Sequence, residues 1–343
     1  MFLNSKFIID GIPQELTPAE ILASVSEKAP ESVDEGGTVL DESLDPPPGS
    51  ICLDPSGTDG YLKSVLSVGP QASVPFADSC TRSRIAYALI DTMWRSGNFK
   101  LDDLPLTAKW HFNPDRVGDM AAFYRSVEAA ADYIDNLRLS LRRYTCEPGD
   151  FDVQFATPFS GAPLLVDDLL HPDSRSWVVY VPFDTSDYRL GGSMLARSLG
   201  LKGGTAPQVT DGDYLMDCFE VVRELAEDGV LLSASTVGEG GLYTALHRMT
   251  RGGIGTVADI SGIMQACGES DQVRILFSEV PGAIVQIRDM DFDYIDAELL
   301  LQDVAFFPLG HPSPDGRIHL EASAKTGIQT ILESLMQNAE GED

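Results

Sequence analysis

The chain has 343 residues, of which 43% are hydrophobic and 22% charged, so it can bury one large core or two moderate ones, and this composition excludes a disordered or fibrous protein. Acidic residues number 53 and basic residues 24, which gives a net charge of −29 and excludes nucleic acids and anionic membranes as expected partners. No apolar run reaches the roughly 18 residues of a membrane helix, and the first ten residues lack the order of a signal peptide. We therefore expect a cytoplasmic protein with no membrane partner.

The five cysteines are scattered along the chain, and no two of them have the spacing of a CxxC motif. This pattern favours neither a disulfide framework nor a zinc site. We expect buried free thiols at all five positions, which are Cys52, Cys80, Cys146, Cys218 and Cys267.

Residues 1–50 are interpreted as a short helix followed by a linker. Thr17 can cap a helix that ends near residue 28, and Glu20 completes a capping box. From residue 29 to residue 50 acidic residues, prolines and glycines predominate. Such a segment cannot bury much apolar area, so it predicts a solvated tether.

Residues 51–175 have the pattern of a packed α/β domain. Apolar side chains recur at helical spacing over residues 85–94 and again over residues 120–134, which predicts two amphipathic helices. Alternating apolar and polar residues predict three strands of one antiparallel or mixed sheet, at 106–111, 137–142 and 151–155. A turn at residues 147–150 separates the last two.

Residues 176–343 are interpreted as a second domain of the α+β type. Asp213 and Gly229 are placed to begin and end a helix. Apolar runs predict strands at 177–181, 230–234, 274–277, 283–287 and 304–308. Helical spacing predicts two further helices, at 242–249 and 326–337.

Two glycine-rich turns, each followed by a predicted helix, are the most distinctive local features. Glycines let a backbone approach a ligand, and the free N–H groups at a helix start can bind an anion. Neither turn matches the P-loop or the GxGxxG pattern, so phosphate binding is one interpretation and an ordinary packed turn is the other. The candidate phosphate-binding residues are Gly191, Gly192, Ser193, Gly238, Glu239, Gly240 and Gly241.

Other residue types with catalytic or ligating chemistry form no clear pattern. No pair of the five histidines has metal-ligand spacing, and no nucleophile with an adjacent base stands out. Glu279 follows a predicted strand and is a candidate ligand, although an acid at such a turn is more often solvated.

Three motifs in a fixed order resemble the phosphoribosylformylglycinamidine synthase family: Gly191–Ala196, Gly240–Leu242 and Leu276–Ala283. More particularly, they resemble the second of the two synthetase halves of the large form, a relative of aminoimidazole ribonucleotide synthetase. The stretches 99–110 and 124–139 support this resemblance, which extends over most of residues 68–320.

The resemblance implies an N-terminal α/β domain whose sheet pairs with a second copy into a barrel, followed by a C-terminal α+β domain. It implies that ATP or ADP with magnesium lies in the cleft between them. The implied reaction is the ATP-dependent conversion of an amide to an amidine in purine biosynthesis, which is a C–N ligase reaction. Glu239, Asp91 and Glu279 would have to serve the metal.

The sequence departs from the family where the family holds its metal and acid–base groups. Where the family has HDxSDGGL, residues 235–242 read STVGEGGL, so the histidine and the first aspartate are missing. The GKDSLS motif has no counterpart at residues 140–145, and Tyr87 and Asp91 stand where a family helix supplies Glu and Asn. A hard metal bound to triphosphate needs several oxygen ligands, so we expect no fully active site in this chain alone.

Arg142 and Arg143 have two interpretations. Their guanidinium groups could replace metal-mediated phosphate contacts by direct ones. An exposed pair on a half-buried strand is the alternative, and it is the more common situation.

We expect a stand-alone homologue of one synthetase half that is catalytically reduced and acts as a structural or nucleotide-holding subunit. The alternatives are an active ATP-dependent ligase of the same superfamily with an altered site, and a non-catalytic acidic interaction protein. The expected partner is a second copy in a homodimer, or a sibling synthetase subunit. The apolar residues of 137–141 and 151–155 would otherwise form an exposed sheet edge.

Overall fold

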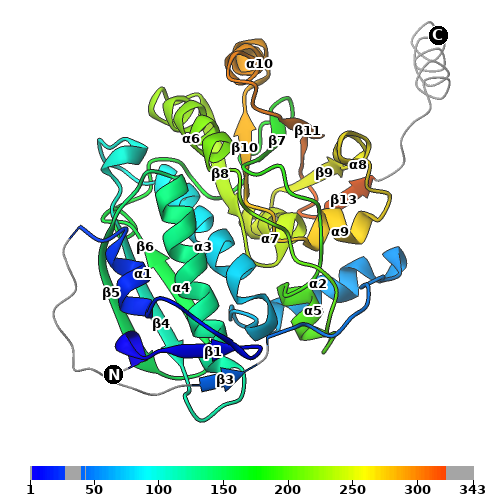
Figure 1. The fold of residues 1–343 in the computed structure, drawn as a ribbon. Coiled ribbons are helices and arrows are strands. Elements are labelled where there is room, and N and C mark those ends of the chain that lie inside the picture. Colours follow the sequence, from blue (N-terminus) through cyan, green and yellow to red (C-terminus); the bar gives the residue numbers. More distant parts are fainter. Residues whose placement is uncertain (1, 28–39, 43, 322–343) are drawn as a thin grey trace, which may run out of the picture.

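The computed structural model describes residues 2–27, 40–42 and 44–321, which form a mixed α/β fold with four separate sheets (Figure 1). Among these residues the strands close no barrel. No helix of the described ranges is both long and apolar enough to span a membrane. The helix predicted at 326–337 lies outside the described residues, and so do residues 29–39 and 43 of the linker predicted at 29–50. Residues 40–42 of that linker form a short strand that pairs with residues 7–9, so this part is not the solvated tether that was predicted.

The N-terminal part contains two small sheets and four helices. In chain order the elements are β1 (Phe7–Ile9), β2 (Ile12–Pro13), α1 (Pro18–Ala23), β3 (Leu40–Glu42), α2 (Thr58–Leu66), α3 (Ala77–Met93), β4 (Leu106–Phe112), α4 (Asp119–Asn136), β5 (Leu141–Pro148) and β6 (Asp152–Ala156). The predicted capping box is confirmed, because the Thr17 side chain accepts from the Glu20 N–H and the Glu20 carboxylate accepts from the Thr17 N–H. The two predicted amphipathic helices are α3 and α4, and both are confirmed.

Strand β4 is the centre of the main N-terminal sheet, parallel to β5 on one side and antiparallel to β6 on the other. The turn between β5 and β6 is present, but these strands are not neighbours, because β4 lies between them. The strand predicted at 137–142 is wrong in its first half. Leu137 and Leu139 close the C-terminal turn of α4 by donating to Tyr133 and Ile134, and Arg138 between them has φ 55. Both leucines are buried. The alternation of apolar and polar residues here therefore reflects a turn that returns to the core, and not a strand.

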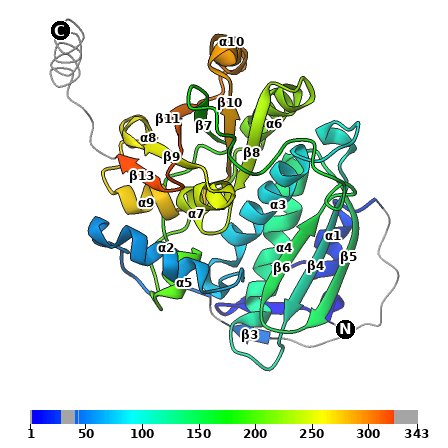
Figure 2. The same cartoon turned by 180° about the vertical axis from the view of Figure 1, so that it is seen from behind.

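Helices α3 and α4 cover one face of this sheet, and its other face is open (Figure 2). Leu106, Ala108, Trp110 and Phe112 of β4 point into the core and are buried. The residues between them, Thr107, Lys109 and His111, are exposed or half-buried. The sheet therefore presents a polar face that no described element covers.

The C-terminal part is built on a four-stranded antiparallel sheet in the order β11-β7-β10-β8 and a smaller sheet in the order β12-β9-β13. In chain order its elements are β7 (Trp177–Pro182), α5 (Met194–Ser198), α6 (Gly212–Glu227), β8 (Leu231–Val237), α7 (Gly241–Met249), β9 (Gly255–Asp259), α8 (Ser261–Cys267), α9 (Gln272–Phe277), β10 (Gly282–Ile287), α10 (Phe292–Leu301), β11 (Phe307–Gly310), β12 (Pro312–Ser313) and β13 (Ile318–Glu321). The strands predicted at 177–181, 230–234 and 283–287 and the helix predicted at 242–249 are confirmed.

Three predictions in this part need correction. The run at 274–277 is helical, as the end of α9, and Asp271 caps that helix. A short run that is buried on every side has no visible period, so it does not distinguish a strand from a helix. Helix α6 is capped by Asp211 rather than Asp213, whereas Gly229 with φ 70 follows its end as predicted. The last predicted strand begins at Phe307 rather than residue 304.

The four-stranded sheet separates two hydrophobic clusters. In β10, Ala283 and Val285 belong to the larger cluster, which also contains α3 and α4, and Ile284 belongs to the cluster around α7 and α9. Because both faces of this sheet are covered by a hydrophobic cluster, the sequences of its strands are continuous apolar runs. The larger cluster contains residues from both sides of residue 175, and the division into 1–50, 51–175 and 176–343 stays a prediction.

The prediction for the cysteines is right in one respect and wrong in another. All five are free thiols. Only Cys218 is buried as predicted, Cys80 and Cys146 are half-buried, and Cys52 and Cys267 are exposed, contrary to the prediction. Cys52 lies on an extended segment before α2, and Cys267 ends α8, a helix that buries only Ile263.

Candidate functional site

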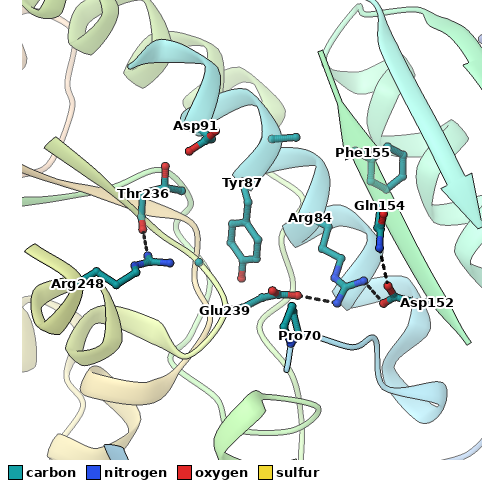
Figure 3. A pocket seen from close by; sticks show the side chains of 12 residues that line it. Pro70, Arg84, Tyr87, Asp91, Asp152, Gln154, Phe155, Thr236, Glu239 and Arg248 are labelled. Atoms are coloured by element: carbon teal, nitrogen blue, oxygen red, sulfur yellow. Dashed lines mark hydrogen bonds and ion pairs between the residues drawn. The ribbon is translucent and has the colours of Figure 1, made fainter. Parts of the chain in front are cut away.

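A cavity of about 410 Å³ lies where helix α3 and strand β6 face the end of β8 and the start of α7 (Figure 3). It therefore lies between the N-terminal and C-terminal parts of the chain. Its polar lining is Arg84, Asp91, Asp152, Gln154, Thr236, Glu239 and Arg248. Pro70, Tyr87, Ala88 and Phe155 add an apolar surface. We call this cavity the central cleft.

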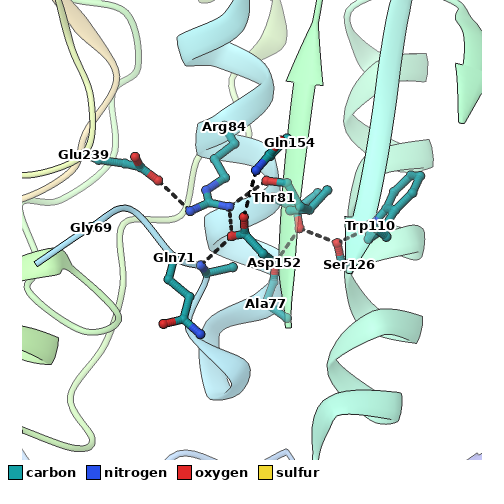
Figure 4. A network of polar contacts seen from close by, with 12 residues as sticks. Gly69, Gln71, Ala77, Thr81, Arg84, Trp110, Ser126, Asp152, Gln154 and Glu239 are labelled. Carbon is teal, nitrogen blue, oxygen red and sulfur yellow. Dashed lines mark hydrogen bonds and ion pairs between the residues drawn. The ribbon is translucent and has the colours of Figure 1, made fainter. Parts of the chain in front are cut away.

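Arg84 spans the central cleft from α3. Its Nη2 atom lies 2.6 Å from the Glu239 carboxylate on the C-terminal side, and its Nη1 atom pairs with Asp152 on β6. Burial alone would lower the pKa of Arg84, but the charges of Glu239 and Asp152 outweigh it and raise that pKa. Asp152 also accepts from the Ala72 N–H at 2.9 Å and from Gln154 at 3.3 Å (Figure 4). One guanidinium therefore joins the two parts of the chain.

A chain of buried hydroxyl groups fixes the helix that carries Arg84. The Thr81 hydroxyl lies 2.7 Å from that of Ser126 on α4 and 2.6 Å from the carbonyl oxygen of Ala77. Trp110 of β4 donates its indole N–H to Ser126 at 2.8 Å (Figure 4). Because the polar atoms of this network are all bonded, α3 is held in one position relative to α4 and β4.

Glu279 connects the two glycine-rich turns. Its Oε1 atom accepts the N–H of Met194, the first residue of α5, and the N–H of Gly240, both at 2.8 Å. Burial raises the pKa of Glu279 to about 7, although these two hydrogen bonds oppose the rise. The structure thus brings the residues of both predicted turns together, around a space of only about 20 Å³.

Close packing accounts for two of the glycines. A Cβ atom on Gly238 would lie 3.2 Å from the ring of Tyr87, which donates its hydroxyl to the carbonyl oxygen of Glu279. Gly241 has φ 73, and a Cβ there would lie 2.7 Å from the carbonyl oxygen of Leu276. The interpretation as ordinary packed turns therefore suffices at these positions.

The three acids predicted to serve a metal do not converge. Glu239 pairs with Arg84, and Asp91 pairs with Arg95 at 3.1 Å. Glu279 accepts two backbone N–H groups. Within the described ranges, no group of three or more His, Cys, Asp or Glu side chains could hold a metal ion. Magnesium bound to a phosphate needs only one or two protein carboxylates, but each of these three is already engaged, so as placed they do not fit the ion.

Two cleft arginines were missed by sequence reasoning. Arg84 pairs with Asp152 and Glu239, which lie 68 and 155 positions further along the chain, so no local sequence pattern identifies it as a site residue. Arg248 on α7 donates from Nη2 to the carbonyl oxygen of Thr236 at 2.6 Å. The only signal in the sequence was the positive charge itself: Arg84 lies on the helix α3, and Arg248 lies on the helix that follows the Gly238–Gly241 turn. Arg142 and Arg143 are exposed on β5 and do not line the cleft, so the exposed-pair interpretation is right for them.

Replacing Glu279 by glutamine is expected to change how stability depends on pH. Glutamine keeps an oxygen for the two N–H groups but does not titrate. The pKa of Glu279 rises from 4.5 to about 7 on folding, so between these values the folded protein binds more protons than the unfolded chain, and stability falls as pH rises. From about pH 4 to about pH 8, the wild type should lose up to about 3 kcal/mol relative to Glu279→Gln.

Urea unfolding of both proteins across this pH range measures the effect. Glu147→Gln is the matched control. The hydrogen bond from Lys109 lowers the pKa of Glu147, so the wild type should gain stability relative to this variant as pH rises. Parallel pH profiles of the wild type and Glu279→Gln would contradict the assignment.

Comparisons with known proteins agree with the resemblance found in the sequence. Residues 184–289 match the family described as AIR synthase related protein, C-terminal domain. Human phosphoribosylformylglycinamidine synthase is 28% identical over 150 residues, which are 43% of this chain and 11% of the human protein. The resemblance to this synthase and to AIR synthase-related proteins is therefore confirmed.

Solved structures agree in fold. PurL from T. maritima complexed with FGAR has a TM-score of 0.54 and 12% identity, over 74% of this chain and 42% of that one. T. maritima PurL complexed with ADP has a TM-score of 0.50 and 13% identity, over 74% and 40%. The chain thus spans less than half the length of each of these relatives.

Proposed function

We propose that this chain, which is similar to phosphoribosylformylglycinamidine synthase and carries an AIR synthase-related C-terminal domain, is a catalytically reduced homologue of one synthetase half. It holds a nucleotide and acts as a structural or nucleotide-holding subunit in purine biosynthesis. The observation that carries the proposal is the central cleft, where Arg84 and Arg248 face a cavity between the two parts of the chain.

The central cleft has the size and the chemistry to bind a nucleotide. Ligand pockets commonly enclose about 300 to 1,000 Å³, and this cavity is about 410 Å³. Two guanidinium groups suit phosphate oxygens, which they bind by charge-assisted hydrogen bonds. Pro70, Ala88 and Phe155 offer a surface on which a base can pack. The PurL structure with ADP, a neighbour in fold, supports a nucleotide as the ligand class.

The same residues support reduced catalysis. Ser235 and Thr236 stand where the family has its histidine and first aspartate. The Thr236 hydroxyl accepts the indole N–H of Trp94 at 3.1 Å, and a hydroxyl has no pKa suited to general acid–base catalysis near neutral pH. The cleft carboxylates are paired with arginines. The residues present therefore bind and orient a ligand, and no catalytic step follows from them.

Calorimetric titration with ADP and with ATP, each with and without magnesium, tests the proposed function. Saturable binding of either nucleotide at one site, in any of these buffers, is the expected result. Absence of binding in all four would overturn the proposal and favour the acidic interaction protein. Turnover of ATP would instead favour the active ligase.

The partner is proposed to be a second copy of the chain, with a sibling synthetase subunit as the alternative. The apolar part of the reason given by the sequence is wrong, because Leu137, Leu139, Leu141, Phe151 and Val153 are buried within the single chain and Phe155 is partly buried. The open face of the sheet is polar instead, with Lys109 at its centre, 2.9 Å from Glu147. Beyond β6 no further strand of the described residues pairs with the sheet. A second copy would complete the hydrogen bonding of that edge.

Light scattering during size exclusion, at low and at high salt, is expected to show a species of twice 37.1 kDa. The net charge of −29 opposes self-association, so the dimer fraction should rise with salt. Lys109→Glu should reduce dimerisation, whereas Lys63→Glu, the same charge change on α2, should not. A 37.1 kDa monomer at both salt concentrations would refute the homodimer and favour the sibling subunit.

A further inference from the structure

We propose that Arg248, together with Arg84, binds the phosphate groups of the ligand directly, without a divalent metal ion. The inference rests on the proposed nucleotide-holding function and specifies how the central cleft performs it. It is supported by the ion pairs of the cleft acids, by the hydrogen bonds of the glycine turns and by the surroundings of Arg248.

The acids of the central cleft are already neutralised by protein groups. Glu239 and Asp152 share the guanidinium of Arg84, and Asp91 pairs with Arg95. A magnesium ion bound to a phosphate needs one or two protein carboxylates, and here each of these carboxylates would first have to leave its arginine. The charge that faces a phosphate here is therefore supplied by arginine.

Two backbone donors of the glycine turns are also occupied. The Glu279 carboxylate accepts the N–H groups of Met194 and Gly240, one from each turn. A phosphate that used these two N–H groups would have to displace this carboxylate. Arg248, which has no contacting carboxylate in the described part of the chain, offers a phosphate a site without that competition.

Of the two cleft arginines, Arg248 is the one without a contacting carboxylate. In the described part of the chain no carboxylate lies within 4.0 Å of it, and the acids Asp91, Glu239 and Asp168 act on it only from a longer distance. Its Nε atom is buried without a hydrogen-bond partner. Its one hydrogen bond in the described structure goes to the carbonyl oxygen of Thr236. A partly buried guanidinium without a contacting carboxylate, in the wall of a cavity, favours an anionic ligand, because a buried charge is stabilised by pairing. Arg84, with two carboxylates, can release one of them to the same ligand.

Calorimetric titration with ADP in EDTA and in excess magnesium tests the inference. ADP should bind in EDTA with the same Kd as in magnesium or a lower one, since magnesium neutralises the charge that the arginines recognise. Arg248→Gln should weaken ADP binding in EDTA by about tenfold or more, because it removes a charge-assisted contact. The same substitution should weaken the binding of inorganic pyrophosphate, which has no base, by a similar factor.

Arg142→Gln, the same change at an exposed position on β5, should leave both affinities unchanged. Circular dichroism checks that Arg248→Gln is folded. If it is not, Arg248→Lys keeps the charge and should retain part of the affinity. A Kd more than threefold higher in EDTA than in magnesium, or ADP affinity unchanged by Arg248→Gln, would overturn the inference and leave the proposed function standing. Absence of ADP binding in both buffers would overturn the inference, and absence of ATP binding as well would overturn the proposed function.

Discussion

The purified chain is expected to form no measurable formylglycinamidine ribonucleotide from ATP, ammonia and the formylglycinamide substrate. The turnover number should lie at least about 10⁴-fold below ordinary enzyme values, because general acid–base catalysis alone contributes roughly 10²- to 10⁴-fold and positioned charge on a transferring phosphoryl group contributes more. The histidine and aspartate that the family has at residues 235 and 236 are serine and threonine here.

A coupled assay for ADP release, with product identified by mass spectrometry, makes this measurement. Human phosphoribosylformylglycinamidine synthase in the same buffer serves as the positive control. Turnover near 1 s⁻¹ or faster by this chain alone would contradict the proposal of reduced catalysis, and would require acid–base groups other than those in the central cleft.

Replacing Arg223 by methionine is expected to lower the free energy of unfolding by about 3–5 kcal/mol. Arg223 lies on α6, is 5% exposed, and donates to the carbonyl oxygens of Met93, Arg95 and Gly97 at the end of α3. Its guanidinium also pairs with Glu227 and lies 4.3 Å from the ring centre of Phe99. Methionine fills similar space but leaves three carbonyl groups without a donor, and the positive charge at the helix C-terminus is lost.

Chemical denaturation measures this difference. Arg223→Lys should be intermediate, because one ammonium group can reach only part of the carbonyl set. Arg288→Met is the control, since Arg288 is 44% exposed and pairs only with Asp291 among the described residues. A loss below about 1 kcal/mol for Arg223→Met would show that the contact contributes little.

Local signals in the sequence predicted local structure well. Thr17 and Glu20 marked a capping box that is present, and the periodicity of 85–94 marked a helix that is present. The failures occurred where burial removes the period, as in α9, or where a helix end returns to the core, as at Leu137 and Leu139. The two-sided burial of β7 and β10 follows only from the packing of two clusters around one sheet.

The candidate site was predicted in part. The two glycine turns, Glu239 and Glu279 do come together, as the order of the family motifs implied. The ion pairs that decide the chemistry, between Arg84, Asp152 and Glu239, join residues far apart in the chain. Periodicity and spacing carry no information about such pairs, and that Arg248 has no contacting carboxylate among the described residues becomes evident only when its neighbours are placed.

Phosphorus NMR of ATP in the presence of excess protein tests most directly whether the central cleft holds a nucleotide without converting it. The three phosphate resonances are expected to broaden or shift as protein is added. No inorganic phosphate should accumulate, even with ammonia and the formylglycinamide substrate present. Unchanged ATP resonances at saturating protein, or phosphate that appears at the rate of the human synthase under the same conditions, would contradict the proposed function.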